Sequence, residues 1–292
     1  MISIIDYKNI NDIKLINEHV NSFKPLLVRN INALKQPCEK WTPEYIAALN
    51  PNLEIPTKQY ESNESINIKR LTLSEYSEYL KKRRNNSNYQ NEEILYCHDI
   101  PIFSLINDLV ADIKPFFLPV LPKWYHEKWW QYAQFFMGPQ GSWTPLHFDC
   151  LLTNNIFFQV RGKKLFTLIK PSDGKYCGRY NWRWFEFNPE KPDYQKFSNM
   201  QQIKMEQIIV NPGDMLYMPP GMLHAVRGLE ESISFNIDFH TNKSVSIALT
   251  KIFFGMPKKN WYYNLICALG LILKMPSKYL FPFYKSYLNY VS

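Results

Sequence analysis

The chain has 292 residues, of which 46% are hydrophobic and 21% charged, and its formal net charge is +8. This length and composition indicate a globular protein with one large domain or two small ones, and they argue against disordered, collagen-like and linker classes. The five cysteines include no CxxC pair, which disfavours both a disulfide scaffold and a cysteine-based zinc site.

Almost all of the net positive charge comes from the C-terminal end of the chain. Residues 241–292 contain seven lysines and no Asp, Glu or Arg, so the first 240 residues carry only +1. This distribution disfavours nucleic acid as a partner of the body. The N-terminus lacks a signal-peptide pattern, and the longest uncharged apolar run, residues 261–273, is too short for a membrane span. We therefore expect a cytoplasmic protein.

Helical spacing and capping residues predict a helix-rich first part, residues 1–128. Helices or helix starts are expected at 12–23, at Thr42-Pro43-Glu44, at the capping-box pattern Thr72 to Glu75 and at 104–113, with a short buried strand at 25–28.

From about residue 129 the pattern changes to short strands rich in Phe, Ile, Val and Tyr. The expected strands are 131–137, 145–151, 155–161, 164–170, 207–210, 214–218 and 232–239. Turn residues separate them, and residues 171–203 are expected to form a long surface loop. Many short strands with even turn spacing predict a mainly β fold, a jelly-roll core over residues 129–240 with flanking helices.

The C-terminal extension, residues 241–292, is expected to be helical over 261–274 and 277–291, with Pro276 and Pro282 as breaks. The favoured interpretation is a helical pair that packs on the chain itself or forms a homodimer with a second copy. A second interpretation is a weak contact with a membrane surface, because the extension combines seven lysines with eleven aromatic residues.

Two histidines and one aspartate form the main candidate for chemistry. His147 and Asp149 fall in an expected strand, where residues two apart share a face. His224 follows the turn residues 219–221, and this layout brings a distant histidine back beside the first strand of a jelly roll. Two histidines and one carboxylate are the ligand set of non-haem iron(II) oxygenases. An isolated His-x-Asp also occurs by chance, so a structural role stays open on the residues alone.

Lys164 is the second candidate. In the expected strand 164–170 it shares a face with Phe166 and Leu168, so an inward Lys164 would lie among apolar side chains. A buried lysine is costly unless an anion accompanies it, which would favour an acidic ligand such as the far carboxylate of 2-oxoglutarate. The alternative is that Lys163 and Lys164 are both solvated turn residues, and the pattern leaves both interpretations open.

Six motifs in one order cover roughly residues 20–240. They are KPLLVR (24–29), EILY (93–96), TPLHFD (144–149), NIFFQVRGKK (155–164), NPGDMLYMPPGMLH (211–224) and FN (235–236). In these motifs the sequence resembles the JmjC/cupin-like iron(II) and 2-oxoglutarate dependent hydroxylases, with particular similarity to the asparaginyl hydroxylases of hypoxia-inducible factor.

The resemblance implies a double-stranded β-helix and assigns roles to eight residues. Iron(II) would lie on His147, Asp149 and His224, the far carboxylate of 2-oxoglutarate on Lys164 with Thr144 and Tyr96, and Asn155 and Asn236 would line the pocket. The implied reaction uses O2, converts 2-oxoglutarate to succinate and CO2, and hydroxylates a protein side chain or a small amino-acid-like molecule.

The substrate-facing positions depart from the asparaginyl hydroxylases. Position 98 is His where those enzymes have an amide, and position 238 is Asp where they have an aromatic residue. We therefore do not expect asparagine to be the residue that this protein hydroxylates. A demethylase with the same chemistry and a non-catalytic metal-binding cupin are the alternatives.

Three other features are weighed for a place near the pocket. His98 is expected at a helix start or in a loop, with the pocket mouth as the alternative. His240 is expected at the surface or rim. The long loop that holds Trp182, Arg183 and Trp184 is a candidate for the substrate mouth, because loops beside a rigid scaffold commonly carry specificity.

Overall fold

The computed structural model describes residues 2–7, 10–60, 66–85, 93–113 and 119–288. The strands are β1 (Ser3–Asp6), β2 (Leu26–Arg29), β3 (Glu54–Tyr60), β4 (Ile66–Thr72), β5 (Tyr96–Ile100), β6 (Ala133–Gly138), β7 (Trp143–His147), β8 (Asn154–Arg161), β9 (Lys164–Ile169), β10 (Glu206–Val210), β11 (Met215–Met218), β12 (Leu223–Gly228) and β13 (Ser232–Phe239). The α-helices are α1 (Ile10–Ser22), α2 (Lys35–Lys40), α3 (Pro43–Leu49), α4 (Leu73–Asn85), α5 (Ile102–Leu105), α6 (Asp108–Asp112), α7 (Lys123–His126), α8 (Asn242–Thr250), α9 (Lys258–Leu271) and α10 (Ser277–Leu288). Short 3₁₀ helices are η1 (Asn32–Leu34), η3 (Trp129–Tyr132), η4 (Pro171–Tyr176), η5 (Ser198–Gln202) and η6 (Lys251–Phe254).

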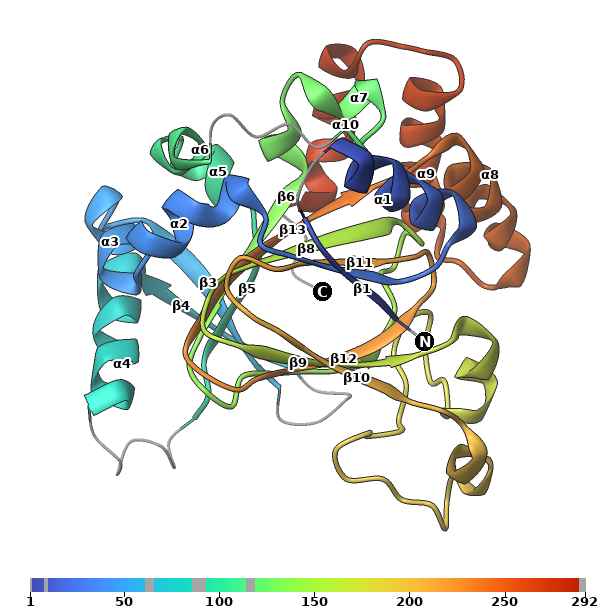
Figure 1. The fold of residues 1–292 in the computed structure, drawn as a ribbon, viewed down its shortest axis with the longest axis horizontal. Helices are drawn as coiled ribbons and strands as arrows, with labels where there is room; N and C mark the ends of the chain where they lie inside the picture. The colour runs from blue at the N-terminus through green and yellow to red at the C-terminus, as the bar shows by residue number, and fades with distance from the viewer. Residues whose placement is uncertain (1, 8–9, 61–65, 86–92, 114–118, 289–292) are drawn as a thin grey trace.

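The strands form two sheets that face each other. The larger sheet has nine strands in the order β1-β2-β11-β8-β13-β6-β5-β3-β4, and the smaller has four in the order β10-β9-β12-β7. Figure 1 shows β9, β10 and β12 opposite β8, β11 and β13, with the helices on the outer side of the larger sheet. The predicted mainly β jelly roll with flanking helices is confirmed.

Both faces of the central strands β6, β8, β11 and β13 of the larger sheet are buried, which explains their continuous apolar runs. On β8 the side chain of Phe157 packs between the sheets with Phe166 of the smaller sheet. Its neighbour Phe158 points the other way and packs under the helices against Phe235. Successive side chains of one strand thus supply two different cores, the inner one of which forms the walls of the barrel.

Several local predictions are confirmed. Residues 12–23 fall largely in α1, and residues 25–28 largely in β2. Thr42 caps α3, where its Oγ1 accepts a hydrogen bond from Tyr45 N at 3.0 Å. The capping box at the start of α4 is present, since Glu75 N donates to Thr72 Oγ1 and Thr72 N donates to Glu75 Oε2.

Other local predictions are wrong. The expected strand 145–151 ends at His147, and the expected helix 104–113 divides into the short helices α5 and α6. Pro282 lies inside α10 rather than breaking it, because the packing of that helix on the core outweighs the cost of a proline. The strands β1, β3, β4, β5 and β12 were not expected.

The tight turn between β8 and β9 supplies a stability test of the barrel, because it carries the chain from the larger sheet to the smaller one. Gly162 has φ +65°, and a Cβ there would lie 2.1 Å from the carbonyl oxygen of Glu231. Gly213, at φ +86°, would meet no atom within 4 Å. We expect Gly213→Ala to lower the free energy of unfolding by about 1–2 kcal/mol and Gly162→Ala by roughly 1–3 kcal/mol more. Denaturant unfolding of both variants measures the difference. Equal losses of unfolding free energy in the two variants would contradict the close approach of Glu231 to Gly162.

Candidate active site

Strand pairing brings two of the predicted site residues face to face. His147 ends β7 and His224 lies near the start of β12, and the two are direct partners in the antiparallel ladder. Directly opposed residues in such a ladder have neighbouring side chains on one face. The ring centroids of the two histidines are 4.2 Å apart, and both side chains are buried.

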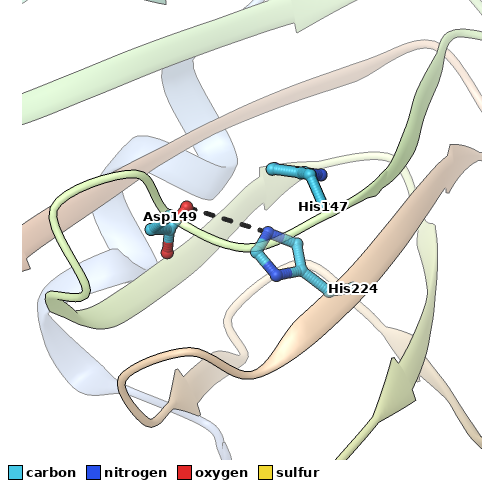
Figure 2. A group of neighbouring side chains, drawn as sticks. All are labelled: His147, Asp149 and His224. Carbon is cyan, nitrogen blue, oxygen red and sulfur yellow. Dashed lines mark ion pairs between the residues drawn. The ribbon is translucent and has the colours of Figure 1, made fainter. Parts of the chain in front are cut away.

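Asp149 completes the group from a turn rather than from the strand. The prediction from strand alternation is therefore wrong for Asp149: β7 ends at His147, and a hydrogen bond from Leu152 N to Asp149 O at 2.8 Å closes a turn. The turn returns the carboxylate toward the histidines, and Asp149 Oδ1 lies 3.9 Å from His224 Nε2 (Figure 2). One ligand atom from each of the three residues lies within 4.8 Å of the other two.

Backbone carbonyls orient both imidazoles. His147 Nδ1 lies 2.7 Å from Pro145 O, and His224 Nδ1 lies 3.1 Å from Met222 O. A carbonyl oxygen only accepts, so each Nδ1 donates its proton and each Nε2 keeps a lone pair. Burial, and then the neighbouring His224, hold the pKa of His147 well below its usual range. The site thus offers two imidazole Nε2 atoms and one carboxylate oxygen, which suit a divalent transition metal such as iron(II).

Lys164 points into the barrel and not into solvent, so the inward interpretation is confirmed. Its side chain is 1% exposed, and its Nζ donates to Tyr96 Oη and Ser234 Oγ, both at 2.8 Å. The rings of Tyr96, Phe136 and Phe157 surround the ammonium with centroids 5.2–5.3 Å away. No carboxylate of the described residues pairs with Lys164, and burial lowers its pKa to about 7. The cavity thus holds a buried cation whose counterion must come from a ligand.

The two predicted amides lie on the metal side of the same cavity. Asn155 Nδ2 donates to Asp149 Oδ2 at 3.1 Å and to Asp238 Oδ1 at 2.9 Å, while Asn236 Nδ2 lies 3.4 Å from Asp238 Oδ1. The Oδ1 atoms of both asparagines are buried without a hydrogen-bond partner among the described residues. The open acceptors call for a hydrogen-bond donor such as a water molecule, whereas Lys164, which has no carboxylate partner in the described part of the chain, fits an anionic cosubstrate.

All eight predicted site residues line one cavity of about 570 Å³, including its open mouth. Within it the Oγ1 of Thr144 lies 3.4 Å from His98 Nε2, and the hydroxyls that contact Lys164 are those of Tyr96 and Ser234, so a contact of Thr144 with the far carboxylate stays a prediction. Ser234 was not predicted. It could have been found from the sequence, because it lies two residues before Asn236 on β13 and therefore shares its face.

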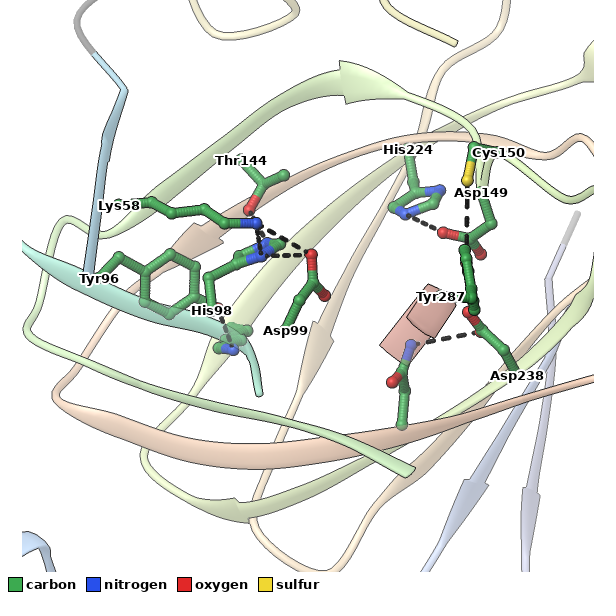
Figure 3. A network of polar contacts seen from close by, with 12 residues as sticks. Lys58, Tyr96, His98, Asp99, Thr144, Asp149, Cys150, His224, Asp238 and Tyr287 are labelled. Carbon is green, nitrogen blue, oxygen red and sulfur yellow. Dashed lines mark hydrogen bonds and ion pairs between the residues drawn. The ribbon is translucent and has the colours of Figure 1, made fainter. Parts of the chain in front are cut away.

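His98 is part of a buried charged cluster at the cavity wall, and the prediction of a loop or helix-start role is wrong. His98 lies in β5, where its Nδ1 is 2.8 Å from Asp99 Oδ2, and Lys58 Nζ lies 3.2 Å from the same oxygen (Figure 3). Burial lowers the pKa of His98 to about 4 although Asp99 opposes this. His98 is therefore a neutral hydrogen-bonding group beside Thr144 at ordinary pH.

Three further residues complete the cavity wall. Asp238 lies on β13, Arg183 comes from the long loop, and Tyr287 comes from α10. Figure 3 shows Tyr287 between Cys150 and Asp238, so a helix of the C-terminal extension reaches the active cavity. The same loop places Trp184 on the ring of His147, with centroids 4.9 Å apart, and its role as the substrate mouth stays a prediction. Nothing in the sequence predicts that Tyr287 lines the cavity, because only the tertiary packing of α10 brings its side chain there.

His240 is fully buried, and the prediction of a rim position is wrong. Its Nε2 lies 2.9 Å from Asn264 Oδ1, and its Nδ1 lies 3.1 Å from Ser244 Oγ. His240 therefore joins the end of β13 to α8 and α9 and takes no part in the cavity.

The titration of Lys164 predicts how anion binding depends on pH. Because its pKa is about 7 without an anion, the ammonium form that binds a carboxylate is depleted as pH rises above that value. We expect the affinity of metal-free protein for glutarate, a dicarboxylate without a chelating group, to be flat below pH 7 and to fall about tenfold per pH unit above it. Calorimetric titration across this range measures the effect, and an affinity independent of pH would contradict a carboxylate on Lys164.

Comparison with known proteins places this cavity in a family. The model of a family described as "Cupin-like domain" matches residues 13–244. Similar curated proteins include 2-oxoglutarate and iron-dependent oxygenase JMJD4 of Gallus gallus, 26% identical over 214 residues (70% of this chain, 49% of the relative). Another is lysine-specific demethylase JMJ30 of Arabidopsis thaliana, 27% identical over 223 residues (72% of this chain, 48% of the relative).

The chain spans about half the length of these relatives, and the family match covers most of the chain, with the entire candidate site except Tyr287 inside it. The resemblance found in the motifs of residues 20–240 is thereby confirmed at the level of the family. The chain is a member of the cupin-like domain family.

Proposed function

We propose that the protein is an iron(II) and 2-oxoglutarate dependent dioxygenase that hydroxylates a protein side chain or a small amino-acid-like molecule. The observation that carries the proposal is Lys164: a buried lysine with no carboxylate partner among the described residues shares one cavity with two imidazoles and a carboxylate. The relative named 2-oxoglutarate and iron-dependent oxygenase supports the same chemistry. When bound, iron(II) with 2-oxoglutarate and O2 would supply the oxidising power for converting a C–H bond to C–OH.

The chain's own residues hold and orient the groups that react. His147, Asp149 and His224 would occupy one face of the metal and leave the opposite face for cosubstrate and dioxygen. Lys164, with the hydroxyls of Tyr96 and Ser234, would fix the far carboxylate of 2-oxoglutarate. The apolar rings around Lys164 keep water out, which strengthens that ion pair.

Asn155 contributes by positioning. Its amide donates to both Asp149 and Asp238, so it holds the ligand carboxylate in a fixed rotamer while leaving the other oxygen free for the metal. Asp238, Asp99 and Arg183 also line the cavity. These polar side chains favour a polar substrate over an apolar one.

The test of the function uses anaerobic protein with iron(II) and 2-oxoglutarate. Wild type is expected to show the visible charge-transfer absorption of the metal chelate and, after admission of O2, to convert 2-oxoglutarate to succinate. Absence of the band in protein that demonstrably contains iron would reject the proposal and favour a non-catalytic metal-binding cupin.

Demethylation is the second candidate, because the relative JMJ30 is named a lysine-specific demethylase. Hydroxylation of an N-methyl carbon gives an unstable product that releases formaldehyde, so the same site serves both reactions. Mass spectrometry of reacted peptides separates them: hydroxylation adds one oxygen, whereas demethylation removes a methyl group and yields formaldehyde.

A further inference from the structure

Helix α9 presents an apolar face to the outside of the protein. Its inner face is buried against the body through Tyr263, Ile266, Cys267 and Leu271. Its outer side carries Lys258, Tyr262 and Leu265 at the spacing i, i+4 and i+7, and Ile272 continues this side directly after the helix, while Leu269 packs partly on the core. Tyr262 and Ile272 are 40% and 44% exposed. A surface helix of a globular protein ordinarily carries polar residues on that side.

The segments at both ends of α9 extend this apolar surface. Before the helix, Phe253 and Phe254 are 86% and 67% exposed, and after it Leu273 is 66% exposed. On α10, Tyr279 and Phe283 are also more than half exposed. Of the thirteen large hydrophobic side chains exposed in the described residues, nine fall within residues 247–283. Such concentration distinguishes a binding surface from scattered apolar residues.

Lysines surround the apolar side chains. Six lysines of α8, α9, α10 and the α9–α10 connection are exposed: Lys243, Lys258, Lys259, Lys274, Lys278 and Lys285. The extension contains no acidic residue, and Lys258, Lys274, Lys278 and Lys285 form no ion pair with the described residues. Figure 1 shows α8, α9 and α10 together outside the nine-stranded sheet, so the charge gathers at one end of the molecule.

A second copy of the chain and an anionic lipid surface are the two candidate partners of this surface, and the charge of the lysines distinguishes them. A two-fold dimer would place the same patch of each copy against the other, and therefore lysines against lysines with no acid of the extension to balance them. An anionic lipid surface has the complementary sign, and apolar and aromatic side chains between lysines are the composition of interfacial helices. No helix in the described part of the chain is long and apolar enough to cross a membrane.

We propose that the extension, residues 241–288, seats the protein on an anionic membrane surface, with α9 lying in the interfacial plane. Phe253, Phe254 and Leu273 enter the headgroup region at the two ends of the helix, and the lysines contact anionic headgroups. The inner faces of α9 and α10 stay packed on the barrel, so docking requires no unfolding. The proposal does not depend on the enzymatic function, because none of these outer residues lines the active cavity.

Vesicle sedimentation tests the proposal with the full chain. Wild type is expected to bind vesicles of phosphatidylcholine with phosphatidylserine, to ignore phosphatidylcholine alone, and to be released by salt. Charge reversal by Lys274→Glu with Lys278→Glu is expected to weaken binding by at least about thirty-fold, since each lysine near an anionic surface contributes roughly 1 kcal/mol and each glutamate is repelled. Phe253→Ser with Leu273→Ser is expected to weaken it without loss of stability, because both side chains are exposed.

Matched controls lie on the body. Lys35→Glu with Lys175→Glu reverses two exposed lysines outside the extension, and Leu105→Ser removes an exposed leucine there. Neither control is expected to change vesicle binding. Three outcomes would overturn the proposal: no binding to either vesicle, equal binding to both, or a dimer by light scattering that Phe253→Ser with Leu273→Ser dissociates. The last outcome would assign the surface to a second copy.

Discussion

Asp149→Ala is expected to weaken binding of a divalent metal by at least about 100-fold and to abolish conversion of 2-oxoglutarate to succinate. The reason is that Asp149 supplies the only negative charge of the three-ligand group, since an imidazole ligand carries none. A bidentate histidine pair alone leaves the metal largely hydrated and exchangeable. Calorimetric titration with manganese(II), which does not oxidise during the measurement, gives the affinity directly.

The control for this variant is Asp108→Ala, which removes an exposed carboxylate of α6. It is expected to leave metal affinity unchanged. Thermal unfolding of Asp149→Ala should stay close to that of wild type, because Asn155 keeps its second acceptor, Asp238. Metal affinity equal to wild type in a folded Asp149→Ala protein would show that the three-residue group is not the metal site.

The architecture could be predicted because its signals are local. Short strands between turn residues predicted the jelly roll, and the capping residues Thr42 and Thr72 predicted the starts of two helices. The alternation of side chains along residues 164–170 predicted an inward Lys164 as one of two interpretations. Each of these signals depends on residues within a few positions of each other, which is the range over which sequence periodicity carries information.

The rest of the site could not be predicted because it is assembled across the chain. Asp149 was expected in a strand, but the path of the backbone after His147 depends on a turn that the His-x-Asp spacing does not encode. His98 meets Lys58 only through the pairing of β5 with β3. Tyr287 enters the cavity from a helix that follows the family match by more than forty residues. Contacts of this kind are set by tertiary packing, which a single sequence does not display.

Lys164→Met is expected to weaken binding of 2-oxoglutarate by at least about 30-fold, because removal of one partner of a buried, hydrogen-bonded charge pair costs about 2–5 kcal/mol. Methionine keeps most of the volume among the rings of Tyr96, Phe136 and Phe157, so the cavity wall stays filled. The neighbour Lys163 is the matched control: it is exposed and pairs with Glu230 at the surface. Lys163→Met is expected to bind 2-oxoglutarate like wild type, and competition against the charge-transfer band measures both.

Lys164→Met weakens ligand binding but is expected to keep or raise the stability of the ligand-free protein. This combination distinguishes a binding role of Lys164 from a structural one. Without ligand, Lys164 is a buried cation with a lowered pKa, so its ammonium form destabilises the fold below the pKa of the unfolded lysine. Lys164→Met removes that cost, and the ligand-free variant should unfold at a temperature equal to or above that of wild type, whereas 2-oxoglutarate should stabilise wild type alone. A lysine that served the fold would give the reverse, a less stable variant whether or not ligand is present.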